Sequence, residues 1–227
     1  ERMEELYPHE IFWAGLLPAL GVPFYVGTSP EAAHGVAAVS GQYFRARTAD
    51  EIEALFENNF VLLNGDALET LVDLGLGRRA GVQSVCWMPQ NSGAYAYEQV
   101  TNGKRYTGVP NARASAIISA SDALDVRYLP EANVRKYTAF YDSFRVRRAT
   151  GETVVNSRVF VYPFGRFADP QDIPPMLLCD VRQEILQDVL VGSGAMRAPM
   201  VERAPYLTPY AFSDGESAHL YLVNGAL

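Results

Sequence analysis

Cysteine and histidine, on which many catalytic and metal-binding sites depend, are scarce in this sequence. The 227 residues include two cysteines and three histidines. His9, His34 and His219 share no spacing typical of metal ligands, so we expect no metal site. Cys86 and Cys179 are interpreted as buried free thiols, with a disulfide between them as the alternative.

Clustered positive charge and long apolar runs are also missing. The formal net charge is −7, whereas binding a nucleic-acid backbone requires clustered lysine and arginine. No apolar run reaches the roughly 18 residues of a membrane span, and no signal peptide is evident. We therefore expect no nucleic-acid partner and no membrane partner. The compartment stays open, with the cytoplasm favoured.

The remaining composition is that of a globular protein. Hydrophobic residues make up 48 % of the chain and charged residues 20 %, a balance that can bury a core. The most informative segment is 60–82. Phe60–Leu63 is an unbroken apolar run, typical of a strand buried on both faces, and Asn64-Gly65 ends it.

A helix is predicted to follow this strand. Asp66 is expected to cap it, with Glu69 completing a capping box, and Gly75 and Gly77 are expected to stop it. Ligands of open α/β sheets bind at the carboxyl ends of the strands. The turn that begins at Asn64 contains neither a nucleophile nor a phosphate-binding loop, so we expect no cofactor and no catalytic residue there.

Strands and helices alternate before this segment. The predicted elements are a strand at Val22–Val26, a short helix that Ser29-Pro30 begins and Gly35 ends, a strand at Val36–Ser40, and a helix that begins at the capping box Thr48–Glu51. This alternation over residues 5–75 predicts parallel strands joined by right-handed crossovers.

The pattern changes after Gly81, where an antiparallel insertion is expected. The Asn102-Gly103 pair predicts a hairpin between Tyr95–Thr101 and Lys104–Val109. Further predicted elements are strands at Leu124–Leu129 and Phe140–Arg147, a turn at Thr150–Glu152 before a strand at Thr153–Tyr162, a helix at Met176–Val191, and a closing hairpin of Tyr206–Phe212 with Ala218–Asn224. We predict an α/β domain over residues 1–192 and a short C-terminal β segment over 193–227.

A ligand site is the first functional hypothesis from the residues. Thr28, Asn64 and Asp66 would line the carboxyl edge of the sheet, and Tyr95 and Tyr97 would add an aromatic platform for a carbohydrate or another small molecule. Helix capping and sheet packing explain the same residues without a ligand. No acidic pair stands out as the carboxylates of a glycosidase.

A cysteine hydrolase is the second hypothesis. Cys86 could act as a nucleophile with His34 or His219. A nucleophile at a strand end is normally flanked by small residues in a sharp turn. Cys86 is instead followed by Trp87-Met88-Pro89, which favours a structural role in the core.

The whole pattern resembles a known family. The motifs are Val61–Gly77 (VLLNGDALETLVDLGLG), Arg182-Gln183-Glu184 and Tyr221–Asn224 (YLVN), in that order around the antiparallel insertion. They are similar to the class I glutamine-amidotransferase-like domain of bacterial β-galactosidase-like proteins, called the trimerisation domain in family 42 glycoside hydrolases. The resemblance covers roughly residues 15–190 and implies a flavodoxin-like, three-layer α/β fold. Residues 218–224 resemble the start of the small β-domain that follows in that family.

The departures from this family bear on function. Active amidotransferases have a Gly-x-Cys-x-Gly motif and a downstream His-x-Glu; Cys86 has no flanking glycines, and His219 is followed by Leu220-Tyr221. The resemblance therefore implies a non-catalytic accessory domain of a carbohydrate-processing protein, which supports homo-oligomer assembly or frames the active site. Because the chain opens within an expected helix and stops just after a strand, we expect it to be part of a longer protein.

Overall fold

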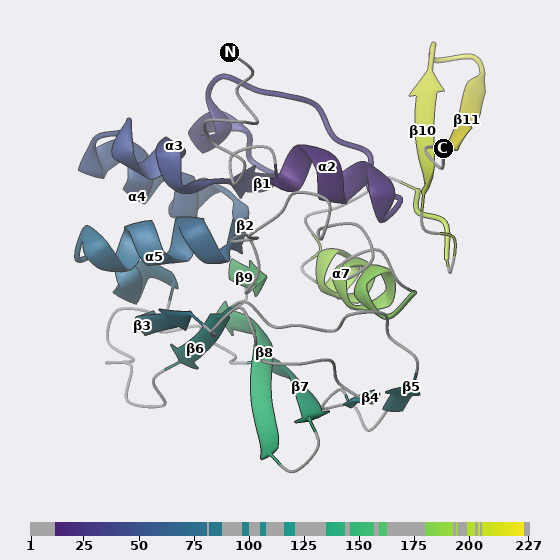
Figure 1. The fold of residues 1–227 in the computed structure, drawn as a ribbon. Coiled ribbons are helices and arrows are strands. Elements are labelled where there is room, and N and C mark those ends of the chain that lie inside the picture. The colour runs from purple at the N-terminus through teal and green to yellow at the C-terminus, as the bar shows by residue number, and fades with distance from the viewer. Residues whose placement is uncertain are drawn as a thin grey trace, which may run out of the picture.

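The computed structural model describes residues 12–80, 82–87, 97–99, 105–107, 116–120, 135–143, 146–156, 159–162, 180–192, 194, 199–202, 204 and 206–224. Their main feature is a seven-stranded mixed sheet (Figure 1). In order across the sheet, its strands are β1 (Val36–Val39), β2 (Phe60–Asn64), β9 (Val159–Tyr162), β8 (Val146–Asn156), β7 (Arg135–Ser143), β4 (Tyr97–Gln99) and β5 (Arg105–Thr107). The first three are parallel and the others antiparallel, which confirms a mixed α/β fold with an antiparallel insertion.

Helices lie to either side of the three parallel strands (Figure 1). One side holds α3 (Gly41–Arg45), α4 (Ala49–Asn58) and α5 (Gly65–Asp73), and the other holds α2 (Phe12–Ala19) and α7 (Asp180–Gly192). Two short 3₁₀ helices, η1 (Pro30–Ala32) and η2 (Gly77–Ala80), complete the described helices. None of the helices in the described part of the chain has the length and apolarity needed to cross a membrane.

The core lies where β2 meets the helices. All five residues of β2 are buried, as the apolar run predicts for a strand covered on both faces. Leu55 of α4 and Leu68 of α5 pack in the same cluster as Leu63 of β2. The capping box of α4 is also confirmed: the Thr48 hydroxyl accepts from the Glu51 N–H, and the Glu51 carboxylate accepts from the Thr48 N–H.

The predicted strand at Val22–Val26 is wrong. Residues 22–27 have no regular secondary structure, and Tyr25 and Val26 are exposed. The reason is that a strand requires a partner, and β1 is paired with β2 alone among the described strands. The next element is shorter than predicted, because Pro30–Ala32 forms one turn of 3₁₀ helix that ends before Gly35.

The caps of α5 also differ from the prediction. Asn64, rather than Asp66, is the N-cap, and its side chain accepts from the Ala67 N–H at 2.8 Å. The C-terminal stop is confirmed at Gly75, which has φ of +74°, the left-handed conformation that favours glycine. Gly77 does not stop this helix, because it begins η2.

Two predictions in the antiparallel region are wrong, because the boundary between two strands lies between Ser143 and Val146 and not at residues 150–152. Phe140–Arg147 is not a single strand, since β7 ends at Ser143 and β8 begins at Val146. Thr150–Glu152 is not a turn, because it lies inside β8, where Gly151 pairs with Thr138. The predicted strand Thr153–Tyr162 is divided between β8 and β9, and Leu124–Leu129 lies outside the described residues.

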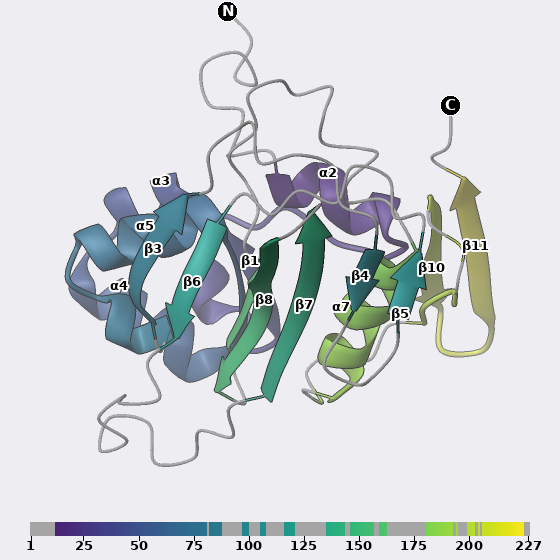
Figure 2. The same ribbon diagram turned by 60° about the horizontal axis from the view of Figure 1, so that its bottom comes forward.

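Two smaller sheets complete the described structure. β3 (Val82–Trp87) pairs with β6 (Ala116–Ala120), and β10 (Leu207–Ser213) pairs with β11 (Ala218–Asn224). They lie on opposite sides of the molecule, with β8 and β7 between them (Figure 2). The pairings of β4 with β5 and of β10 with β11 confirm both predicted hairpins, and α7 confirms the predicted helix from residue 180 onward.

Candidate functional site

The carboxyl end of β2 is the first candidate for a ligand site. Its polar side chains stabilise the fold instead of facing a ligand. Asn64 is fully buried and its side-chain oxygen caps α5. Asp66 is buried in the first turn of the same helix, where a carboxylate interacts favourably with the helix dipole. An oxygen that already accepts a backbone N–H is a weak candidate for holding a carbohydrate hydroxyl. The two side chains are therefore explained by helix capping and burial.

Gly41 shows how closely this edge is packed. A Cβ at Gly41 would lie 2.8 Å from the Thr70 hydroxyl oxygen and would collide with the Asp66 carboxylate. Glycine leaves room for both side chains at the start of α3, and a larger residue would force them to move. The Thr70 hydroxyl is itself buried and has no hydrogen-bond partner among the described groups. Protein atoms thus occupy the space around Gly41 at the end of β1.

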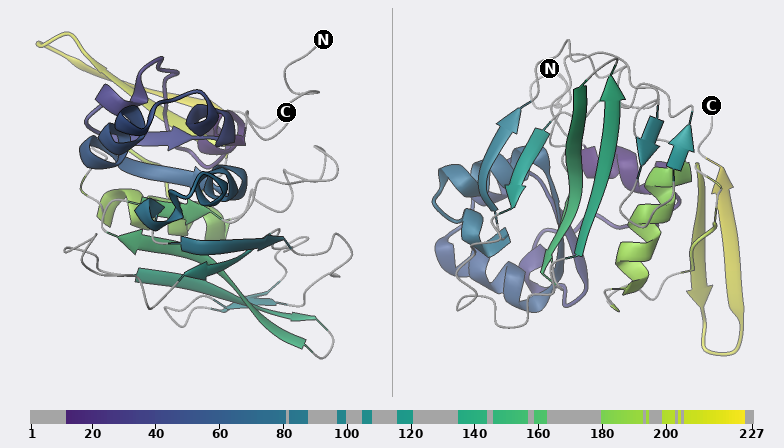
Figure 3. Two further views of the ribbon diagram at one scale, coloured as in Figure 1. Left: turned by 90° about the vertical axis from the view of Figure 1, so that its left-hand side faces the viewer. Right: turned by 90° about the horizontal axis from the view of Figure 1, so that it is seen from below.

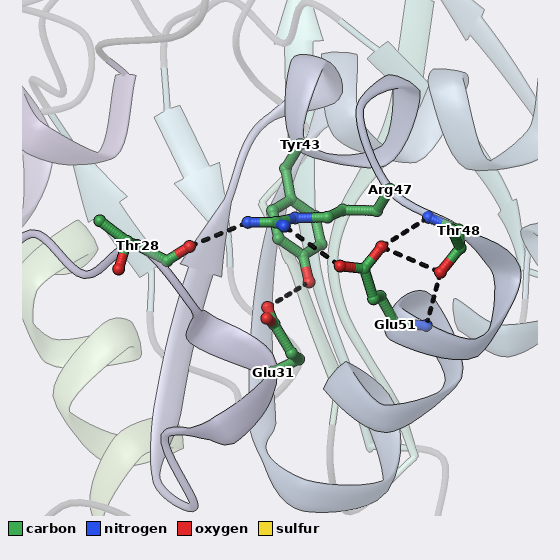
Figure 4. Close-up of polar contacts among 6 residues, drawn as sticks. All are labelled: Thr28, Glu31, Tyr43, Arg47, Thr48 and Glu51. Carbon is green, nitrogen blue, oxygen red and sulfur yellow. Dashed lines mark hydrogen bonds and ion pairs between the residues drawn. The ribbon is translucent and has the colours of Figure 1, made fainter.

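Thr28 lies in a different group of polar residues, which we call the Arg47 cluster (Figure 4). Its members are Thr28, Glu31, Tyr43, Arg47, Thr48 and Glu51. Arg47 donates to the Thr28 carbonyl oxygen at 2.8 Å and to Glu51 at 3.2 Å, and its guanidinium lies 5.3 Å from the centre of the Tyr43 ring. The Tyr43 hydroxyl donates to Glu31 at 3.1 Å. The cluster thereby attaches the loop before β1 to α3 and α4.

The electrostatics of the Arg47 cluster fit a structural role. The backbone N–H and the hydroxyl of Thr48 donate to Glu51 and hold the pKa of its carboxyl below the ordinary value, with a smaller effect of Arg47. Burial, followed by the hydrogen bond to Glu31, raises the pKa of Tyr43 above its ordinary value. A tyrosine with a raised pKa is a poor general base at neutral pH. We therefore assign the cluster to loop attachment.

The predicted aromatic platform is not brought to this edge. Tyr97 lies in β4, four strands away from β2 in the sheet order. At about 4.8 Å per strand, this separation is about 19 Å. Tyr95 lies outside the described residues. Tyr97 is therefore separated from Asn64 across the sheet, and Thr28 lies in the loop before β1.

The residues of the hydrolase hypothesis are spread in the same way. Cys86 lies in β3 opposite Ile117 of β6, whereas His219 lies in β11 opposite Phe212, on the other side of the molecule (Figure 2). His34 occupies the turn before β1 with φ of +51°, at the amino end of the parallel strands. Cys179 and His9 are outside the described part. Within that part, no three histidine, cysteine or acidic side chains gather as metal ligands would.

The feature that sequence reasoning missed is an exposed apolar surface on the β10–β11 hairpin. We call it the hairpin surface. It consists of Phe212, Leu220, Tyr221, Leu222 and Val223, each between 50 and 60 % exposed. The hairpin extends away from the helices and the main sheet (Figure 3), and none of its fourteen strand residues is lysine, arginine, aspartate or glutamate. That absence of charge was the available signal, because exposed strands normally include charged residues.

The base of the hairpin is attached firmly. The Thr208 hydroxyl donates to the Pro18 carbonyl at 2.6 Å, and the Tyr206 N–H donates to the Ala19 carbonyl at 2.6 Å. Gln183 of α7 donates to the Leu20 carbonyl and accepts from the Ala204 N–H. These bonds hold β10 against α2 and α7, so the exposed strand β11 is presented in a defined position.

No protein-family model, curated protein or solved structure matches this chain. The resemblance of the sequence to the amidotransferase-like domain therefore stays a prediction, and function is argued from the geometry above.

Proposed function

We propose that this chain is a non-catalytic accessory domain of a carbohydrate-processing protein and that it supports assembly of that protein into a homo-oligomer. The main support for assembly is the hairpin surface, which exposes apolar side chains on a positioned hairpin whose two strands contain no lysine, arginine, aspartate or glutamate. Exposed apolar patches of this kind mark interaction sites in soluble proteins. The link to carbohydrate processing rests on the family resemblance.

The carboxyl edge of the parallel strands supports the non-catalytic part of the proposal. Ligands of α/β proteins usually bind at this edge, but here Asn64 caps a helix and Asp66 is buried beside Gly41. In the finer fold that we propose, flavodoxin-like and of the amidotransferase-like type, this edge would hold the nucleophile. The Gly-x-Cys-x-Gly motif is missing from the sequence, in agreement with a domain that has no reaction of its own.

Sedimentation of the 227-residue chain tests assembly. We expect the weight-average mass to rise with concentration above that of the monomer. A mass that stays monomeric across the whole accessible range would contradict the assembly function. Calorimetry with galactosides and oligosaccharides, run beside it, is expected to show no heat of binding.

A carbohydrate-binding module is the second candidate, because Phe212 and Tyr221 form an exposed edge-to-face aromatic pair with ring centres 5.7 Å apart. Exposed aromatic rings can pack against carbohydrate rings through their apolar faces. Heat of binding that disappears in Tyr221→Ala, in a chain that sediments as a monomer, would favour this candidate over assembly.

A further inference from the structure

One edge of β11 is not paired with any other described strand and is available to a partner. We infer that β11 pairs in antiparallel fashion with β11 of a second copy of this chain, an inference that rests on the proposed function and names the surface it uses. Among the described strands β11 pairs with β10 alone, and all seven of its residues are exposed. An unpaired strand edge presents backbone N–H and C=O groups that another strand can bind. Charge and proline normally protect such edges, and residues 218–224 contain neither.

The sequence of β11 suits pairing with itself. If the pairing is centred on Tyr221, Leu220 lies opposite Leu222 of the partner subunit, and the two tyrosines lie opposite each other. No like charges are brought together, because the strand has none. A two-fold axis through Tyr221 then makes the interface isologous and closed, which limits assembly to a dimer at this edge.

Pairing of two copies would enlarge the apolar surface on both faces of the hairpin. Leu220 and Leu222 share one face with Pro209, while Tyr221 shares the other with Tyr210 and Phe212. A two-stranded hairpin alone is marginally stable in water, whereas more strands with an apolar face are stable. Pairing of two copies produces four strands, with four leucines from two subunits together on one face.

Exposed apolar side chains lie beside the edge that would pair. The hairpin surface has five large apolar side chains, each at least half exposed. At roughly 200 Å² for a side chain of this size, they offer about 500 Å² per copy. Two copies therefore expose about 1,000 Å² of apolar surface in all, and pairing of the two β11 edges covers the part of it that lies along the shared edge.

The net charge of the whole chain opposes association of two copies, but the strand that would pair contains no charged residue. Each copy has a net charge of −7, so two copies repel at low salt. The interface itself is uncharged, and salt screens the repulsion between the bodies. Self-association is therefore expected to strengthen as salt is added, whereas association with a positively charged partner would weaken.

The experiment is sedimentation of the full chain and three variants. Leu222→Glu and Leu220→Lys each place a charge on β11, and we expect each to weaken self-association by about tenfold or more. Leu74→Glu is the matched control: Leu74 is about as exposed but lies at the end of α5, so self-association should stay within about twofold. Circular dichroism confirms that each variant is folded.

Mixing the two charged variants tests the register. In a mixed dimer centred on Tyr221, Lys at 220 lies opposite Glu at 222, so we expect association of the mixture to exceed that of either variant alone. If the unmodified chain associates but neither β11 variant weakens it, the edge inference is wrong and the assembly function stands. If the unmodified chain is monomeric at every concentration and salt, both are wrong.

Discussion

Two apolar runs of equal length differ in burial: one is in the core and the other is exposed. Phe60–Leu63 of β2 is between 0 and 5 % exposed, whereas Leu220–Val223 of β11 is between 50 and 60 % exposed. β2 has a strand on each side, and α4 and α5 pack against it, while β11 has β10 as its neighbour among the described strands. An apolar run thus predicts a strand, and the number of neighbouring elements decides whether the strand is buried.

The difference separates internal stability from association. Burial of β2 removes apolar surface from water and stabilises the monomer. The same kind of surface on β11 stays in water and contributes little to the monomer, but it is available to a partner. Substitutions in the two strands should therefore affect different measurements.

The largest expected effect is the contrast between Leu62→Ala and Leu222→Ala. Leu62 is almost fully buried, and its truncation should lower the free energy of unfolding by about 2–5 kcal/mol because it leaves a cavity. Leu222 is 54 % exposed, and its truncation should change that free energy by less than about 0.5 kcal/mol. Urea unfolding at a concentration where the chain is monomeric measures both.

Leu62→Met is the control for this pair, since it keeps the volume and should cost less than about 1.5 kcal/mol. Equal losses for the two alanine variants would mean that β11 is buried in the monomer, and the comparison would fail.

A smaller effect is expected for Gly41→Ala in the buried region. The added methyl group meets the Thr70 hydroxyl and the Asp66 carboxylate, so the loss should be about 1–3 kcal/mol, measured by urea unfolding. Gly15 is the matched control, because it lies in α2 and none of the described residues has an atom close to its missing Cβ. Gly15→Ala should increase stability by about 0.5–1 kcal/mol, since alanine favours helix. The same sign for both variants would contradict close packing at Gly41.

The end of β2 provides the next test. Asn64→Ala removes the cap of α5 and should cost about 1 kcal/mol, while Asn64→Asp keeps an acceptor and should cost less. Ser213→Ala is the counterpart in the hairpin, where it removes the acceptor for the Gly215 N–H. That change should leave global unfolding unaltered, because the turn is exposed. Thermal unfolding compares the three variants, and an equal loss for Ala and Asp at residue 64 would exclude capping as the cause.

Local signals in the sequence were sufficient for elements that depend on a few neighbouring residues. The β2 strand, the capping box of α4 and the Gly75 stop follow from such signals, as do the two hairpins. Elements that need a distant partner were predicted less well. Val22–Val26 has strand-like residues without a paired neighbour, and the bounds of β7 and β8 depend on pairing along nine residues of each strand.

The candidate site could not be assembled from sequence for the same reason. Asn64 and Asp66 are both common N-cap residues, and the choice depends on β2 continuing to Asn64, which pairs with Tyr162 of β9. Thr28 is held through its backbone carbonyl, an interaction that its side chain does not encode. The position of Tyr97 depends on strand order, which no local pattern specifies.

The smallest expected effect is a difference in acid sensitivity between the two regions. Hydrogen bonds from Thr48 hold the pKa of Glu51 below its ordinary value of 4.5, and the N–H groups of Ser217 and Glu216 hold that of Asp214 below 3.8. A carboxyl with a lowered folded pKa contributes stability above its unfolded pKa, and this contribution is lost as pH falls through the folded value. Glu51 caps a helix of the core, so the stability difference between the unmodified chain and Glu51→Gln should shrink below pH 4.5.

Asp214 lies in a turn that can open without the core, so Asp214→Asn should alter local amide exchange while leaving the urea midpoint unchanged at every pH. A midpoint that follows Asp214 as closely as Glu51 would show that hairpin and core unfold as one unit.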